Sequence, residues 1–144
     1  MERSERIEKA EKAFREFMEA LDLDFKDDNF TNTPHRVAKM FVNETCRGLF
    51  EDLKDIKVTS FDNKNNYKWM VVVKKIEVHS LCAHHFQNFD GYCHIAYIPG
   101  KKVVGLSKFS RIVNHFARRP QTQEFLVQEI FDFLKQILDT EDVA

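Results

Sequence analysis

The strongest constraint on the fold is a change of hydrophobic period along the chain. Residues 67–81, YKWMVVVKKIEVHSL, are dense in β-branched and aromatic side chains, and residues 89–100, FDGYCHIAYIPG, have a similar composition. Such runs are typical of β-strands, so we predict one long strand and a second strand that returns beside it. On both sides of this pair, apolar side chains instead recur at three- and four-residue spacing. The pattern predicts an α+β fold with two helices before the strands and two after them.

Four helices are predicted from these repeats. The first covers residues 4–21, and the second begins at Thr33, which we expect to cap it, and ends near Gly48. The third begins at Leu106, and Pro120 separates it from the fourth. The predicted apolar faces are, in chain order, Ile7, Ala10, Phe14, Phe17, Met18 and Leu21; Val37, Met40 and Phe41; Phe109, Ile112, Val113 and Phe116; and Leu126, Ile130, Phe133, Leu134, Ile137 and Leu138.

Composition narrows the class of protein. With 144 residues, 43% apolar, and fourteen phenylalanines against four glycines and three prolines, the chain is expected to fold as a single unit around one core. The formal net charge of −1 gives the whole chain no electrostatic attraction to nucleic acid or to a membrane surface, so neither partner is expected. The N-terminus is charged throughout, and no run is long enough to span a bilayer, so we expect a cytoplasmic protein.

The segment SLCAHHF, residues 80–86, contains a candidate metal site. Cys82 and His85 form a C-x-x-H pair at a strand end, and thiolate and imidazole are the usual ligands of zinc. A zinc site normally needs three or four protein ligands, so the alternative is a buried cysteine beside two partly exposed histidines at a turn. If the segment is extended, His84 points away from the other two and faces a substrate instead.

The other cysteines and strand histidines have simpler interpretations. His79 and His94 are expected to be ordinary strand positions that neighbouring groups satisfy. Three cysteines, Cys46, Cys82 and Cys93, are an odd count at scattered positions, which favours reduced thiols or metal ligands over a disulfide framework.

A basic stripe is predicted on the third helix. Lys108, Arg111, His115 and Arg118 follow one another at intervals of three, four and three, which places them on one helix face. Ser107 adds a hydroxyl near the helix N-terminus, where backbone N–H groups favour an anion. Such a face can hold a polyphosphate or can simply be solvated.

The fourth helix begins with two further candidates, Gln123 and Glu124. A carboxylate at Glu124 can accept from the paired N–H donors of a purine edge, or it can merely favour the helix N-terminus.

Four blocks of this sequence resemble the signature blocks of GTP cyclohydrolase I, in the same order and at similar spacing. They are TPHRVAKMF, SLCAHHF, GYCHIAYIPGKKVVGLSKFSRIV and ARRPQTQE. The resemblance runs from about residue 20 to the end. It implies the tunnelling fold, an antiparallel sheet with two helices packed on one face. Under that resemblance, residues 51–144 form the tunnelling-fold domain after an N-terminal helical region at 1–50.

The resemblance also implies an activity and an assembly. The family converts GTP and water into 7,8-dihydroneopterin triphosphate and formate, at the entry to folate, pterin and deazaguanine synthesis. Its subunits form ring-stacked homo-oligomers, commonly decamers, with active sites between neighbouring subunits.

Individual residues match the family's metal site. Cys82 and His85 match two of its three zinc ligands, and the zinc ion lowers the pKa of a water that attacks C8 of guanine. His84 matches a histidine that assists proton transfer, which makes it the candidate catalytic residue. Ala83 stands where the family usually has a glutamate.

The resemblance assigns the substrate contacts to other segments. Ser107, Lys108, Arg111 and, from an adjacent subunit, Arg36 match positions that bind the triphosphate. Gln123 and Glu124 match the pair that recognises guanine.

One departure and two alternatives follow from the match. We expect the chain to lack the family's last strands, which bring the third zinc ligand, a second active-site histidine and another phosphate-binding arginine. One alternative is a non-catalytic tunnelling-fold subunit that binds nucleotide or assembles with a partner. The other is the related nitrile reductase of queuosine synthesis, which uses a cysteine nucleophile and NADPH without zinc, and the C-x-H-H block argues against it.

Overall fold

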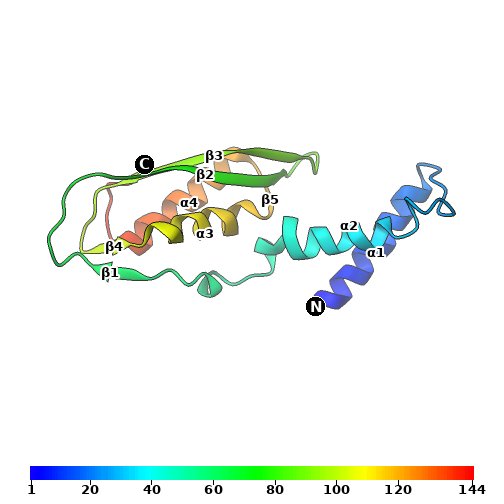
Figure 1. Cartoon of the computed structure of the whole chain (residues 1–144), viewed down its shortest axis with the longest axis horizontal. Coiled ribbons are helices and arrows are strands. Elements are labelled where there is room, and N and C mark those ends of the chain that lie inside the picture. The colour runs from blue at the N-terminus through cyan, green and yellow to red at the C-terminus, as the bar shows by residue number, and fades with distance from the viewer. The chain divides into compact units, whose positions relative to one another are not determined.

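The computed structural model describes residues 1–144, which form two compact units, Met1–Arg47 and Gly48–Ala144. The elements of each unit are labelled in Figure 1. Helices and strands are both present, which confirms the predicted mixture of α and β structure. The predicted order of two helices, a strand pair and two helices is also confirmed, with three short strands in addition.

The Met1–Arg47 unit is a pair of helices. Helix α1 spans Arg3–Glu19 and helix α2 spans Thr33–Met40, with a π-helical turn at Phe41–Thr45. The side chain of Thr33 does not cap α2 as expected, because its Oγ1 donates to the Asn29 carbonyl at 3.0 Å. The second helical segment is therefore shorter as an α-helix than the sequence predicted.

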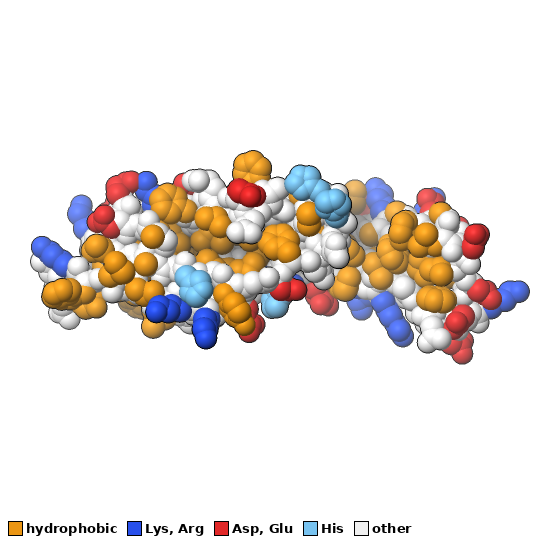
Figure 2. Space-filling view, turned by 90° about the horizontal axis from the view of Figure 1, so that it is seen from above, with side chains coloured by type: hydrophobic (Ala, Val, Ile, Leu, Met, Phe, Trp, Pro, Cys, Tyr) orange, Lys and Arg blue, Asp and Glu red, His pale blue; other side chains and the backbone are white.

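This unit keeps large apolar side chains at its surface. Phe17 is 55% exposed, Leu21 is 56% exposed and Met40 is 40% exposed, whereas Met18 and Ala38 are buried. Figure 2 shows hydrophobic groups gathered on the face of this unit that it draws. The predicted apolar stripes are thus only partly buried within the unit itself.

The Gly48–Ala144 unit is built on a long antiparallel strand pair. Strand β2 spans Val71–Cys82 and pairs with β3, Asn88–Tyr97. A register shift between Val73 and Ile76 marks a β-bulge, and Lys75 there has a left-handed φ of 57°. Both predicted strands are confirmed.

Three short strands complete the β structure. Strands β1, Ser60–Asp62, and β4, Lys102–Val104, form their own antiparallel ribbon. Strand β5, Pro120–Gln121, pairs in parallel with the end of β2, which gives the order β3-β2-β5. Short 3-10 turns at Arg47–Leu49 and Leu53–Asp55 precede the strands. We expected an antiparallel sheet, and the parallel pairing of β5 with β2 departs from that expectation.

Two helices cover one face of the β2–β3 pair (Figure 1). They are α3, Leu106–Ala117, and α4, Gln123–Leu138. Phe109, Ile112 and Val113 of α3 are fully buried. With the inward side chains of β2, β3 and α4 they form one core, whose burial is the main favourable term in folding. This core fixes how both helices lie against the sheet.

The end of the chain returns to β3. Val143 forms an isolated antiparallel bridge with Tyr97, and Ala144 exchanges two backbone hydrogen bonds with Ala96, at 2.7 and 2.8 Å. None of the helices combines the length and the apolar character needed to cross a membrane.

Candidate active site

The candidate metal pair lies in the turn that joins β2 to β3. Strand β2 ends at Cys82, and Phe86 N–H donates to the Cys82 carbonyl at 2.9 Å. The Cys82 N–H donates to the Gln87 carbonyl at 2.8 Å, and Phe86 adopts a left-handed φ of 52°. The segment is therefore a tight turn, not the extended strand on which the predicted direction of His84 depended.

Because the chain turns here, both imidazoles lie near the Cys82 sulfur. The Nδ1 atom of His85 is 3.6 Å from Cys82 Sγ, and that of His84 is 4.0 Å from it. Hydrogen bonds from the His85 side chain and from the backbone N–H groups of His84 and His85 lower the pKa of the Cys82 thiol from 9.0 to about 6. The turn thus favours a thiolate beside two imidazoles.

The Cys82–His85 pair has the geometry of two neighbouring zinc ligands. Zinc–sulfur bonds of about 2.3 Å and zinc–nitrogen bonds of about 2.0 Å at a tetrahedral angle place the two donor atoms about 3.5 Å apart. The observed 3.6 Å between Sγ and Nδ1 fits that value. No group of three or more His, Cys, Asp or Glu side chains in the chain is arranged to hold a metal. The structure therefore brings together two candidate ligands.

Strand β5 ties this turn to the start of α4. Its Gln121 pairs with Cys82, and the Gln121 carbonyl accepts a hydrogen bond from Ala83 N–H at 3.0 Å. Thr122 then caps α4, since its Oγ1 accepts from Phe125 N–H at 3.4 Å. The parallel pairing therefore joins the Cys82–His85 turn to the segment that carries Gln123 and Glu124. Sequence reasoning missed it, because a two-residue strand has no hydrophobic period.

The prediction of a basic stripe along α3 is wrong for its last two members, His115 and Arg118. Ser107 and Arg111 are exposed and Lys108 is partly exposed. His115, in contrast, is 5% exposed and packs edge-on against the Phe116 ring. Helix α3 ends before the last member of the stripe, because Arg118 is its C-cap and donates through Nε to Asn114 Oδ1 at 3.3 Å. The cations of α3 itself that are at least partly exposed, Lys108 and Arg111, therefore lie in its first two turns, and Arg118 follows the helix as a partly exposed C-cap.

No side chain caps the first turn of α3, although the Lys108 N–H already donates to the Gly105 carbonyl at 2.9 Å. Its N-cap, Gly105, has no side chain that could occupy the first N–H groups, and Ser107 and Lys108 lie beside them. Backbone N–H groups at a helix N-terminus attract negative charge. This end of the helix can therefore contribute both a cation and backbone donors to a phosphate.

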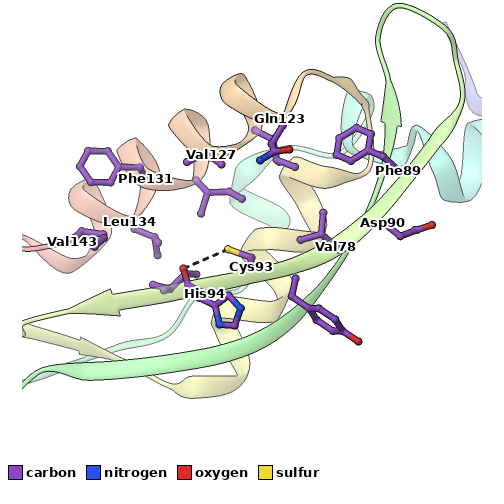
Figure 3. Close-up of a pocket in the computed structure, with 16 residues that line it drawn as sticks. Val78, Phe89, Asp90, Cys93, His94, Gln123, Val127, Phe131, Leu134 and Val143 are labelled. Carbon is purple, nitrogen blue, oxygen red and sulfur yellow. Dashed lines mark hydrogen bonds between the residues drawn. The ribbon is translucent and has the colours of Figure 1, made fainter.

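Gln123 and Glu124 are exposed in the first turn of α4. Gln123 also lies at the edge of a groove of about 390 Å³ between β3 and α4, which Figure 3 draws. The groove is lined mainly by apolar side chains, among them Val78, Phe89 and Leu126. Glu124 is not among its lining residues. The two candidates therefore share a helix turn but face different surroundings.

The remaining candidates are carried by other elements, α2 and β2. Arg36 lies on α2 in the other unit, where it lines a surface pocket together with His35 and Lys39. His79 Nδ1 lies 2.6 Å from Asp90 Oδ1 on the neighbouring strand, so it has the ordinary partner expected of a strand position.

All three cysteines are free thiols. Cys46 is buried, and Cys93 lines the β3–α4 groove, where its Sγ lies 4.0 Å from the His94 carbonyl. Burial raises the pKa of both thiols. Cys82 is therefore the only thiol in the chain that its surroundings favour in the ionised form.

Comparison with known proteins gives these features a family context. A family model described as GTP cyclohydrolase I matches residues 10–144. The chain belongs to the GTP cyclohydrolase I family. Because the match covers both units, the Cys82–His85 turn, helix α3 and the start of α4 all lie within it.

Individual relatives are similar over most of this chain. GTP cyclohydrolase 1 of Aeromonas hydrophila is 51% identical over 127 residues, which cover 88% of this chain and 58% of the relative. The enzyme of that name from Flavobacterium johnsoniae is 46% identical over 140 residues, 97% of this chain and 62% of the relative. The one from Vibrio campbellii is 48% identical over 125 residues, 86% of this chain and 57% of the relative. The chain thus spans less than two thirds of the length of these relatives.

Proposed function

We propose that this chain acts as a GTP cyclohydrolase I, converting GTP and water into 7,8-dihydroneopterin triphosphate and formate. The observation that carries the proposal is the Cys82–His85 turn. Its sulfur and nitrogen donors lie 3.6 Å apart, as two ligands of one zinc ion do, in a chain that is 51% identical to a protein named for this reaction.

In this proposal Cys82 and His85 would hold a zinc ion, and the bound ion would supply a nucleophilic water near neutral pH for attack at C8 of guanine. His84 transfers protons at the imidazole ring of the substrate. Its ring lies beside the same sulfur, with Nδ1 4.0 Å away, and imidazole is the side chain most often used as a general acid or base.

The triphosphate binds to the first two turns of α3. Ser107, Lys108 and Arg111 supply a hydroxyl, an ammonium and a guanidinium there, at a helix N-terminus that no side chain caps. Arg36 completes this site from an adjacent subunit of a homo-oligomeric ring with the tunnelling fold. Such an assembly requires no contact between Arg36 and α3 within one chain.

Guanine binds at the first turn of α4. The Glu124 carboxylate accepts from the guanine N1–H and amino group, and Gln123 adds an amide that both donates and accepts. Strand β5 supports this arrangement, because it links the start of α4 to the metal turn through the Ala83–Gln121 hydrogen bond.

Calorimetry with GTP, GDP and guanosine tests the phosphate site. Affinity should fall in that order, because each charge-assisted phosphate contact is typically worth about 1.5–3 kcal/mol. Lys108→Ala should lower the affinity for GTP, whereas Lys64→Ala, in a surface loop, should not. Equal affinity for GTP and guanosine would refute the assignment.

A second titration tests the base site. The protein should prefer GTP to ATP, and Glu124→Ala should remove that preference, since adenine presents the wrong hydrogen-bonding edge to a carboxylate. Asp132→Ala on the same helix is the matched control. An unchanged preference in Glu124→Ala would place the base elsewhere.

The alternative is a nucleotide-binding or assembly subunit without hydrolytic activity. It is favoured by the number of ligands, because one chain brings two candidate ligands together and a catalytic zinc site uses three. Such a subunit would bind GTP with the same selectivity and release no formate.

A further inference from the structure

The connector, residues 118–122, joins α3 to α4 and forms one wall of the Cys82–His85 turn. Its Pro120 and Gln121 pair in parallel with Leu81 and Cys82, and the Gln121 carbonyl accepts from Ala83 N–H at 3.0 Å. The Arg119 carbonyl accepts from the hydroxyl of Ser80 at 3.4 Å. A shift of the connector would therefore move the start of α4 relative to the turn.

A single carboxylate on α4 contacts two connector side chains. Glu129 Oε2 accepts a hydrogen bond from Gln121 Nε2, and Glu129 Oε1 lies 3.5 Å from Arg119 Nη1. The Gln121 side chain is buried and that of Arg119 is 20% exposed, whereas the Glu129 side chain is 39% exposed, so water screens the Glu129 contacts on one side only. Each oxygen of Glu129 thus has its own partner.

The same two side chains also reach the end of α3. Arg119 Nε donates to the Phe116 carbonyl at 3.3 Å, and its guanidinium lies 5.0 Å from the centre of the Phe116 ring. Gln121 Nε2 lies 3.4 Å from the same carbonyl. The two side chains therefore bridge α3 and α4, and Glu129 is the charged group on the α4 side of the bridge.

We propose that Glu129 is a positioning residue that fixes the connector and thereby sets Gln123 and Glu124 against the Cys82–His85 turn. What Gln123 and Glu124 bind rests on the proposed function. That Glu129 holds the connector in place rests on the contacts above alone. Glu129 itself makes no contact with substrate in this account. It acts through Arg119 and Gln121.

Hydrogen exchange at the Ala83 amide tests the structural part directly. In Glu129→Ala this amide should exchange about tenfold faster, because the connector that accepts its hydrogen bond loses both of its side-chain contacts with α4 and keeps only those with α3 and β2. Glu129→Gln keeps an acceptor for Gln121 but loses the charge opposite Arg119, so its effect should be smaller. Asp132→Asn, an exposed acid-to-amide change on α4, should leave Ala83 unchanged. The amides of Ile112 and Val113 should keep their protection in all three variants.

Nucleotide titrations of the same variants test the functional part. Glu129→Ala should reduce the GTP-over-ATP preference about tenfold, because the base-recognition turn loses its fixed position. The ratio of GTP to guanosine affinity should stay the same, since Ser107 and Lys108 are placed by the buried face of α3. A general loss of structure would change both ratios together.

The outcomes separate this inference from the proposed function. Unchanged exchange at Ala83 in Glu129→Ala overturns it, and so does faster exchange with an unaltered GTP-over-ATP preference. Equal acceleration at Ala83, Ile112 and Val113 also overturns it, because that result shows general destabilisation. If the unaltered protein binds no nucleotide, the proposed function fails, and exchange at Ala83 alone then decides whether Glu129 holds the connector.

Discussion

At the scale of single residues, the surroundings of each thiol distinguish Cys82 from Cys46 and Cys93. Hydrogen bonds lower the pKa of Cys82 to about 6, whereas burial raises the pKa of the other two thiols. A lowered pKa means that the stabilising effect of these bonds is complete above pH 9.0 and is lost as the pH falls towards 6. The thiolate is also the form that reacts with alkylating reagents.

We therefore expect metal-free protein to be alkylated at Cys82 with a midpoint near pH 6, and Cys46 and Cys93 to react slowly at neutral pH. Peptide mass spectrometry after timed iodoacetamide labelling measures the three rates. His85→Ala should move the midpoint towards 9.0, because the His85 side chain is the largest cause of the shift. Similar rates for all three cysteines at pH 7 would be inconsistent with this account.

The backbone of Gly48, at the start of its unit, lies close to the backbone at the end of α3. Its N–H donates to the Arg118 carbonyl at 2.8 Å, and an added Cβ would lie 2.3 Å from the His115 carbonyl oxygen. Because these neighbours are backbone atoms, Gly48→Ala should lower the free energy of unfolding by about 1–3 kcal/mol, as overpacking does. Urea denaturation measures the change. Gly91→Ala is the control, since its Cβ would meet nothing within 4 Å, and an equal loss in both variants would contradict this explanation.

At the scale of elements, the buried face of α3 positions its exposed one. Phe109 is fully buried in the core, while Leu106 at the start of the same helix is 62% exposed. Phe109→Ala should lower the free energy of unfolding by about 3–5 kcal/mol through the cavity it leaves. Leu106→Ala should change it by less than about 0.5 kcal/mol. Denaturant unfolding of the two variants makes the comparison, and a similar loss in both would mean that α3 is not held by this face.

The same helices show what periodicity can predict. The spacing of Phe109, Ile112, Val113 and Phe116 predicts α3 correctly, because one long apolar face dominates that segment. The spacing of charged residues does not predict which of them are accessible. His115 shares the helix face of Lys108 by count, yet it is buried, because the chain near Gly48 passes over the end of α3.

Short elements and single turns were less predictable from the sequence than long helices and strands. Strand β5 depends on pairing with a segment about forty residues earlier in the chain, so its two residues carry no local signal. The direction of His84 depended on the backbone of one turn, which a left-handed Phe86 closes. Of the candidate site, the residue types at the metal turn were predicted, whereas the contact of that turn with the connector was found only in the structure.

At the scale of the whole molecule, the candidate site residues are divided between the two units. Arg36 belongs to Met1–Arg47, and the metal turn, the α3 cations and the α4 pair belong to Gly48–Ala144. The expectation that residues 1–144 fold as a single unit remains a prediction.

If Arg36 binds phosphate from an adjacent subunit, Arg36→Ala should weaken GTP binding in the assembled oligomer. Mixing Arg36→Ala chains with Lys108→Ala chains should then regenerate some intact sites. Calorimetry on the mixed oligomers measures this recovery, and its absence would contradict the shared site.

The most direct test of the central claim is zinc content measured together with formate release from GTP. Two versions are compared, the 144-residue chain and an extended version in which this chain is joined to the residues of the Aeromonas hydrophila relative that the match does not cover. We expect the extended version to hold about one zinc per chain and to release formate, and the 144-residue chain, with two candidate ligands, to do both less well. Cys82→Ser should abolish both properties in the extended version, and Cys93→Ser should not. A zinc-loaded extended protein that releases no formate, or one unaffected by Cys82→Ser, would contradict the account.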